Sequence, residues 1–487
     1  MENKRERPVT LNFILNVLLK LSGLICAAVS YPFAFRMIGE SGMGRVAFSA
    51  SVISFFAMAA SLGISTYGIR ECARVRDDRG RLSKTAFELL ALQCVMTLAA
   101  LAALALTTAA VPRMRENWRL FLIQGGMLLF CSLDTEWLFA ACEDYGFLTV
   151  RSFVTRALSV ALIILFVRSP DDYVLYCFFT VVPAVLGNIW NILGAGKYIS
   201  RRDVSGKPDI WRHVAPSAVF FLQAVAITVY TNLDSALLGF FCGDAVVGAY
   251  DGAVKVKLVL TIFVTGLGTV LLPRFSYYLG QGRRADYEKG IGLSADFVWI
   301  TAIPLTVFFL LEGAPVLELL YGHAPEGSPE SLRWLILTLI PIGVTNLLGM
   351  QILTPLGRER AVMWSVTAGA AVDLAADLVL IPIIGAPGAA LGTLLAELAV
   401  LAVQLVCLRG TGVRFFSLRD FGAALAVSVL SAAVLPLVQL APLGNTARVL
   451  ISAGAYFLTA LALLLALKAP VLQYSLEFLR SRKGKDR

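Results

Sequence analysis

Apolar runs recur along the whole chain and are separated by short polar connections. A helix of about 20 apolar residues is long enough to cross the hydrocarbon core of a bilayer. Fourteen such segments can be drawn, near residues 11–36, 45–69, 85–111, 118–139, 146–168, 173–196, 214–241, 246–272, 290–311, 331–356, 361–385, 387–408, 420–440 and 447–467. The pattern therefore predicts an all-α, polytopic membrane protein with about fourteen transmembrane helices.

Composition supports this prediction. The 487 residues are 58% hydrophobic and only 15% charged, and the mean hydropathy is +0.76. A soluble domain is about 25% charged. No connection between the apolar segments is long enough for a soluble domain, so we expect the function to lie within the bilayer or at its two faces.

The basic residues that give the net charge of +9 are spread over alternate connections rather than gathered into one patch. Each connection takes the number of the apolar segment that precedes it. Of the 42 Lys and Arg residues, 30 lie in the termini and the even-numbered connections, and 7 in the odd-numbered ones. Lys and Arg favour cytoplasmic loops, so both termini are expected to be cytoplasmic. The basic excess is thus an orientation signal, and no nucleic-acid partner is expected. The basic N-terminus runs straight into the first apolar segment, which favours a span over a cleaved signal peptide.

Cysteine and histidine offer no metal or redox motif. The eight cysteines are scattered without a C-x-x-C pair, and the two histidines, His213 and His323, are far apart. Neither a disulfide framework nor a zinc site is predicted, and no organic cofactor is expected.

A weak internal repeat separates two similar turns by about 204 residues. "IGESGMGRVAF" (Ile38–Phe48) follows the first apolar segment, and "CGDAVVGAY" (Cys242–Tyr250) follows the seventh, with Gly44 corresponding to Gly248. Two six-helix halves followed by a trailing pair are typical of transporters. We expect an N-terminal lobe over 1–213, a C-terminal lobe over 214–410, and two further helices with a basic tail over 411–487. Chance similarity of glycine-rich turns is the alternative.

Two acids stand within an otherwise uncharged stretch, in "VDLAADLVLIP" (Val372–Pro382). Asp373 and Asp377 are four residues apart, so a helix places them on one face. Two neighbouring carboxylates repel each other unless a cation lies between them or one is protonated. With a hydroxyl such as Thr393 on the next segment, they would suit a hard cation. The alternative is that both acids make structural hydrogen bonds within the helix bundle.

Four stretches of the chain resemble one family in order. They are "GMGRVAFSASVISFFAMAASLGISTYGIRECARVRDD" (Gly42–Asp78), "LDTEWLFAACEDYGFLTVRSFVTRALSV" (Leu133–Val160), "YTNLDSALLGFFCGDAVVGAYDGAVKV" (Tyr230–Val256) and "LVLIPIIGAPGAALGTLLAE" (Leu378–Glu397). The sequence resembles bacterial polysaccharide-export and lipid-linked oligosaccharide flippases of the multidrug/oligosaccharidyl-lipid/polysaccharide superfamily. With its two extra C-terminal helices, the predicted topology is similar to that of the fourteen-span members, which include the lipid II flippases.

The resemblance implies two lobes around a V-shaped cavity, alternating access, and passage of a glycan carried on a polyprenyl diphosphate. It also implies a Na⁺ site among the seventh, eleventh and twelfth helices, where Asp234, Asp373, Asp377 and Thr393 stand. Na⁺ or H⁺ is the expected coupling ion. The expected location is the bacterial cytoplasmic membrane, with other envelope-polysaccharide assembly proteins as possible partners.

A diphosphate headgroup that crosses a low-dielectric slab needs cationic partners. An ionisable residue in a span is costly and needs a reason. The candidates for binding the diphosphate or glycan are Lys20, Arg70, Arg156, Lys255 and Lys257. Each has a structural alternative, which is clearest for Lys255, because Asp251 precedes it by one helical turn.

Two other functions are considered. A multidrug or organic-cation antiporter of the same fold would favour an acidic, aromatic cavity, and the lysines of the spans argue against it. A membrane polymerase or ligase of lipid-linked sugars would need catalytic residues in an outward loop. The segment Glu312–Ser331 has Glu318, His323 and Glu326 but no arginine, so we expect a transporter and not an enzyme.

Overall fold

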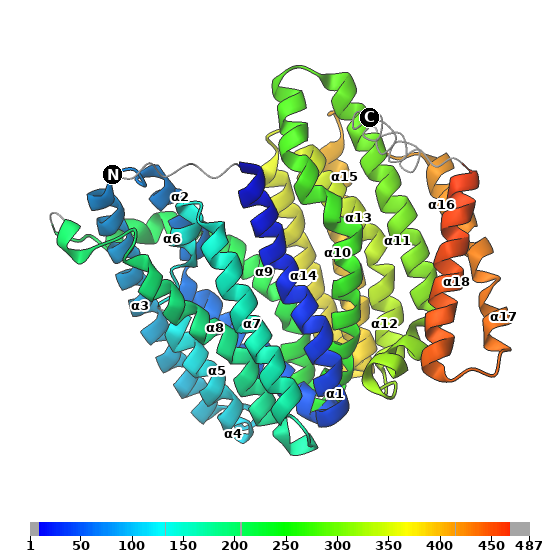
Figure 1. Cartoon of the computed structure of the whole chain (residues 1–487), viewed down its shortest axis with the longest axis horizontal. Coiled ribbons are helices and arrows are strands. Elements are labelled where there is room, and N and C mark those ends of the chain that lie inside the picture. The colour runs from blue at the N-terminus through cyan, green and yellow to red at the C-terminus, as the bar shows by residue number, and fades with distance from the viewer. Residues whose placement is uncertain (1–8, 132, 205–206, 414, 468–487) are drawn as a thin grey trace, which may run out of the picture. The chain divides into compact units, whose positions relative to one another are not determined.

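A computed structural model describes residues 9–131, 133–204, 207–413 and 415–467 of the chain. The side chains of residues 9–18, 20, 21, 131, 269 and 270 lie outside this description. All regular elements of the described residues are helices, so the predicted all-α class is confirmed (Figure 1). The chain separates into two compact units, Met1–Gly248 and Ala249–Arg487. The expected lobe boundary at residues 213 and 214 rests on the repeat and stays a prediction.

Helices α1 to α9 and the start of α10 make up the first unit. Their bounds are α1 (Val9–Ser61), α2 (Ile64–Arg74), α3 (Arg79–Ala110), α4 (Pro112–Glu116), α5 (Trp118–Cys131), α6 (Glu136–Ala141), α7 (Tyr145–Phe166), α8 (Tyr173–Ala195) and α9 (Val214–Phe241). Helix α1 packs against α3, α5, α7, α8 and α9 and is the centre of this unit.

The second unit is formed by most of α10 and the helices that follow it. Their bounds are α10 (Asp244–Gly280), α11 (Arg284–Tyr321), α12 (Ser328–Leu337), α13 (Leu339–Asn346), η4 (Leu347–Leu353), α14 (Glu359–Ile384), α15 (Ala386–Leu408), α16 (Leu418–Ala432), α17 (Leu435–Gln439) and α18 (Asn445–Ala466). The trailing helices α16 and α18 lie beside α11 (Figure 1). The Tyr456 hydroxyl fixes this packing by donating to the Pro304 carbonyl oxygen at 3.1 Å.

Twelve helices of the described residues are long and apolar enough to cross a membrane. The first of these, Ser22–Arg74, contains two predicted spans, which are two helices that meet at a kink at Gly39, where φ is 78° and the backbone is not helical. The predicted span near 118–139 is divided into the short helices α5 and α6. The membrane-protein class is confirmed, whereas the count of fourteen stays a prediction.

The two turns that the repeat relates lie directly against each other within the first unit. A Cβ added at Gly44 would collide with the Asp244 carbonyl oxygen, and one added at Gly248 would collide with the Glu40 carbonyl oxygen. Glycine at both positions therefore permits a close approach of the two backbones. Because each turn contributes one glycine and one carbonyl, the contact is reciprocal.

Candidate functional site

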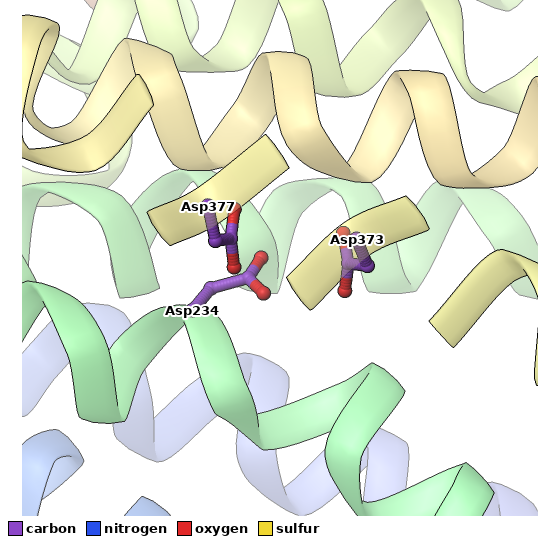
Figure 2. Close-up of side chains that lie close together, drawn as sticks. All are labelled: Asp234, Asp373 and Asp377. Carbon is purple, nitrogen blue, oxygen red and sulfur yellow. The ribbon is translucent and has the colours of Figure 1, made fainter. Parts of the chain in front are cut away.

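The acidic pair lies on one face of α14 and is fully enclosed. Asp373 is 1% exposed and Asp377 is 0% exposed. Their spacing of one helical turn places both carboxyl groups on the same side of the helix, as predicted. Figure 2 shows the two side chains projecting from α14. Two enclosed carboxylates on one helix face are the strongest candidate for a cation or proton site in the second unit.

Helix α15 approaches the acidic pair through small residues. A Cβ added at Gly392 would collide with the Asp377 Oδ1 atom, so glycine at this position leaves room for the carboxylate. Thr393 is the next residue, and its hydroxyl donates to the Ala389 carbonyl oxygen at 3.1 Å. The close helix packing thus positions a hydroxyl oxygen on the helix that faces the acids.

Tyr250 is an additional member of this region that the sequence analysis missed. Its hydroxyl lies 3.3 Å from Thr393 Oγ1, and both residues are buried in the second unit. Because Thr393 uses its own proton on Ala389, the Tyr250 hydroxyl is the donor in this pair. Tyr250 ends the repeated turn sequence, but no local pattern connects it with a residue 143 positions later.

Asp234 projects from α9 in the first unit and is also buried (Figure 2). The other three acid and hydroxyl residues predicted for the cation site, Asp373, Asp377 and Thr393, all belong to the second unit.

Arg70 is exposed near the end of α2 and lies against two aromatic rings. Its guanidinium carbon is 5.1 Å from the centre of the Phe220 ring and 5.7 Å from that of Tyr67. These distances are within the range of cation–π contacts. Arg70 makes no ion pair with a described residue, so its N–H groups are available to an anionic ligand.

Arg156 is half-buried on α7 and is satisfied by oxygen atoms of α1. Its Nη1 atom donates to the Leu19 carbonyl oxygen at 2.8 Å and to Ser22 Oγ at 2.8 Å. These neutral acceptors leave the positive charge without a carboxylate among the described residues. The arrangement links α7 to α1 and keeps a cation within the helix bundle.

The lysines of α10 differ from each other. Lys255 Nζ lies 3.2 Å from Asp251 Oδ1, which is the ion pair that their spacing predicts. Lys257 makes no ion pair with a described residue, and it lies about 200° around the helix from Lys255. Lys20 lies in α1, but its side chain is outside the described residues. The roles of these three lysines in binding stay predictions.

Two ion pairs of the first unit, each with one buried and one exposed member, were not predicted. Glu88 of α3 is paired with Arg212, and Arg151 of α7 is paired with Glu136 of α6 at 2.9 Å. The first pair is separated by 124 residues, so no sequence window contains both partners. The second pair gives Arg151 a carboxylate partner 15 residues earlier in the chain, on a different helix.

Comparison with known proteins places these features in a family. A model for "Polysaccharide biosynthesis protein" matches residues 9–279, and a model for "Lipid II flippase MurJ" matches residues 211–461. Each match covers more than half of the chain. The chain belongs to the polysaccharide-biosynthesis and lipid-linked flippase family. Its function is therefore transport across a membrane by a flippase, and it is not an enzyme, as the sequence analysis expected.

Individual relatives of this family member are distant in sequence. A putative O-antigen transporter of Shigella dysenteriae is 23% identical over 291 residues, which cover 58% of this chain and 71% of that protein. A putative O-antigen transporter of Escherichia coli K12 is 21% identical over 423 residues, 84% of this chain and 98% of that protein.

Solved structures support the fold. The lipid II flippase MurJ in an inward closed conformation has a TM-score of 0.74 at 14% identity, with 93% of this chain and 98% of that one covered. An inward-facing multidrug resistance MATE transporter has a TM-score of 0.59 at 13% identity, with 80% and 93% covered. Both likenesses concern the fold alone, which the flippase and the multidrug alternative share.

Proposed function

We propose that this flippase moves a polyprenyl-diphosphate-linked oligosaccharide from the inner to the outer leaflet by alternating access, coupled to Na⁺ or H⁺. The proposed location is the bacterial cytoplasmic membrane, with both termini cytoplasmic. Other proteins of envelope-polysaccharide assembly are the proposed partners. The proposed substrate class rests on one observation. Some basic side chains within the spans lack a carboxylate partner among the described residues.

The headgroup chemistry follows from these cations. A diphosphate carries several negative charges, which would be costly to desolvate without cationic partners. Arg70, Arg156 and Lys257 are candidates for this task. Arg70 and Arg156 have aromatic or neutral neighbours in place of an ion-pair partner, and Lys257 makes no ion pair with a described residue. An organic-cation substrate would meet repulsion at the same positions, which favours an anionic cargo over the multidrug alternative.

The coupling site is proposed at Asp234, Asp373, Asp377 and Thr393. Asp373 and Asp377 are both enclosed on one face of α14, which supports an ion or a proton shared by their carboxyl groups. Carboxylate and hydroxyl oxygens are ligands of hard cations, and a shared proton would relieve the same repulsion. Binding an ion here would change the charge of α14, so its binding and release can be linked to a conformational change.

Depletion of this protein tests the substrate class. We expect a lipid-linked glycan to accumulate on the inner leaflet, and its chemical identification names the cargo. The purified chain is then reconstituted with that lipid, and Na⁺ and pH gradients are imposed separately. Transport that responds to neither gradient would contradict the coupling. Normal glycan export in depleted cells, with loss of organic-cation efflux, would contradict the cargo and favour the multidrug function.

A further inference from the structure

A line of four side chains in the first unit leads from a buried carboxylate to Arg70. Glu88 of α3 is 0% exposed, and its Oε2 atom lies 3.0 Å from Nε2 of His213, which is 1% exposed and precedes α9. The other ring nitrogen of His213 lies 2.9 Å from the Tyr67 hydroxyl. The Tyr67 ring in turn faces the Arg70 guanidinium.

The direction of these hydrogen bonds follows from their partners. A carboxylate only accepts, so the imidazole nitrogen that faces Glu88 carries the proton. In the neutral imidazole, Nδ1 is then the acceptor, and the Tyr67 hydroxyl donates to it. Arg212 Nε is 3.2 Å from the same Nε2 atom, but Arg212 makes its shorter bond, of 2.5 Å, to Glu88 Oε2.

Hydrogen bonds that run in one direction polarise one another. The negative charge of Glu88 makes the His213 imidazole a better acceptor, and this draws the Tyr67 proton toward His213. The phenol ring consequently becomes richer in electrons. A ring with more electron density attracts a cation more strongly across its face, and the cation that faces this ring is Arg70.

The second ring against Arg70 is placed by a close approach of two helices. Gly63 precedes α2 with a φ of 71°, and a Cβ added there would lie 2.6 Å from the Phe221 backbone nitrogen. Only glycine allows the start of α2 to approach the α9 backbone so closely. This contact brings Phe220 of α9 close to the guanidinium, which thereby lies against rings from two helices.

We propose that Tyr67, His213 and Glu88 are positioning residues that hold Arg70 in the orientation which binds a diphosphate headgroup. The centres of the two rings are 6.3 Å apart, so both rings lie toward one side of the guanidinium, and its N–H groups on the other side remain available for a bidentate contact with phosphate oxygens. This inference rests on the proposed function through Arg70. It adds a buried network at the junction of α2, α3 and α9 to the residues that determine headgroup affinity.

A double-mutant cycle on the full chain in nanodiscs tests this arrangement. The probe is geranylgeranyl diphosphate, and geranylgeraniol, which has no phosphate, controls for binding of the apolar tail. We expect Arg70→Gln to weaken probe binding about tenfold, the scale of a lost charged hydrogen bond. Tyr67→Phe keeps the ring but removes the hydroxyl, and we expect about a threefold loss, the scale of a weakened cation–π contact.

The coupling between the two positions is the decisive readout. If Tyr67 acts through Arg70, Tyr67→Phe has no further effect in the Arg70→Gln background. Tyr198→Phe is the matched control, because it removes a 2.8 Å hydroxyl–carboxylate bond to Asp144 in the same unit. We expect this control to leave probe binding unchanged. Thermal unfolding of each variant checks that the helices remain packed.

The outcomes separate this inference from the proposed function. Wild-type probe binding by Arg70→Gln would overturn both the diphosphate role of Arg70 and its positioning. A weakened Arg70→Gln combined with wild-type binding by Tyr67→Phe would overturn the positioning alone. Equal losses from Tyr67→Phe in both backgrounds would also overturn it, because they would show an effect that does not pass through Arg70. His213→Gln is expected to reproduce Tyr67→Phe, and the tyrosine variant decides if the histidine variant does not fold.

Discussion

Asp244 holds the repeated turns together, and its replacement by asparagine should loosen them. Its Oδ1 atom is 2.6 Å from Arg113 Nη2, and its Oδ2 atom is 3.0 Å from Arg45 Nε. Arg113 also donates to the Gly239 carbonyl oxygen at 3.1 Å, so it connects α4 to the end of α9. Asp244→Asn keeps the shape of the side chain but removes the charge that both arginines contact.

The magnitude follows from the exposure of each pair. The Arg113 and Asp244 side chains are 26% and 13% exposed, and a charged hydrogen bond in such a setting contributes about 2 kcal/mol. Arg45 is 41% exposed, so its ion pair contributes only about 0.5 kcal/mol. The sum of about 2.5 kcal/mol corresponds to a change of roughly 60-fold in the equilibrium between joined and separated turns.

Cys242 provides a native reporter for this separation. Burial raises the pKa of its thiol, so reaction with maleimide is slow while the turns are joined. We expect Asp244→Asn to accelerate labelling of Cys242 by a membrane-impermeant maleimide added outside intact cells. Because burial raises the pKa of this thiol, labelling of the wild type should also rise with pH as more thiolate forms.

A matched variant controls for the loss of charge. Glu116 is 68% exposed and lies 3.7 Å from Arg113 Nη1, so Glu116→Gln removes a weaker partner of the same arginine. We expect this variant to label at the wild-type rate. Identical labelling of Asp244→Asn and wild type would refute the reasoning, and so would equal acceleration in both variants.

Three further predictions concern the transport sites. Asp377→Asn should abolish cation-dependent transport in proteoliposomes while the protein remains folded, and unchanged cation dependence would contradict a coupling role. Gly392→Ala should lower the affinity for the coupling ion at least about tenfold, because its Cβ would displace the Asp377 carboxylate; an unchanged ion dependence in a transport titration would contradict this. Lys257→Met should weaken diphosphate binding about tenfold. Lys255→Met should weaken it less, since Asp251 already pairs with Lys255, and the reverse order in a binding titration would count against the assignment.

The membrane-spanning segments were predictable because each depends on local composition. Long apolar runs determine α3, α7, α9 and α15 without any knowledge of their neighbours. The turn between the first two spans was predictable as well. Gly39 has a positive φ of 78° and a non-helical backbone, and this kink lies in the glycine-rich turn between the two predicted segments. The division of the predicted span near 118–139 into α5 and α6 was not predictable from composition.

Buried polar contacts could be predicted only when both partners lie within one helical turn. The Asp251–Lys255 pair and the shared face of Asp373 and Asp377 both follow from a spacing of four residues. The contact between Glu88 and His213 joins residues 125 positions apart. In the sequence, Glu88 is a single glutamate within one apolar segment, and His213 is a single histidine directly before another apolar segment. Neither residue indicates which partner it will contact.

The span cations differ in how their charge is balanced, and this difference carries the functional argument. Arg151 and Lys255 each have a carboxylate at short distance, which explains their presence without any cargo. Arg156 has a carbonyl and a hydroxyl oxygen, which satisfy its N–H groups but leave its charge uncompensated. Arg70 and Lys257 have no described carboxylate partner at all. A positively charged side chain within a membrane span is costly unless a negative charge lies near it. In a flippase whose cargo carries a diphosphate, the cargo itself supplies the missing negative charge during transport. The uncompensated residues, rather than all the basic ones, are therefore those whose replacement should affect headgroup binding most.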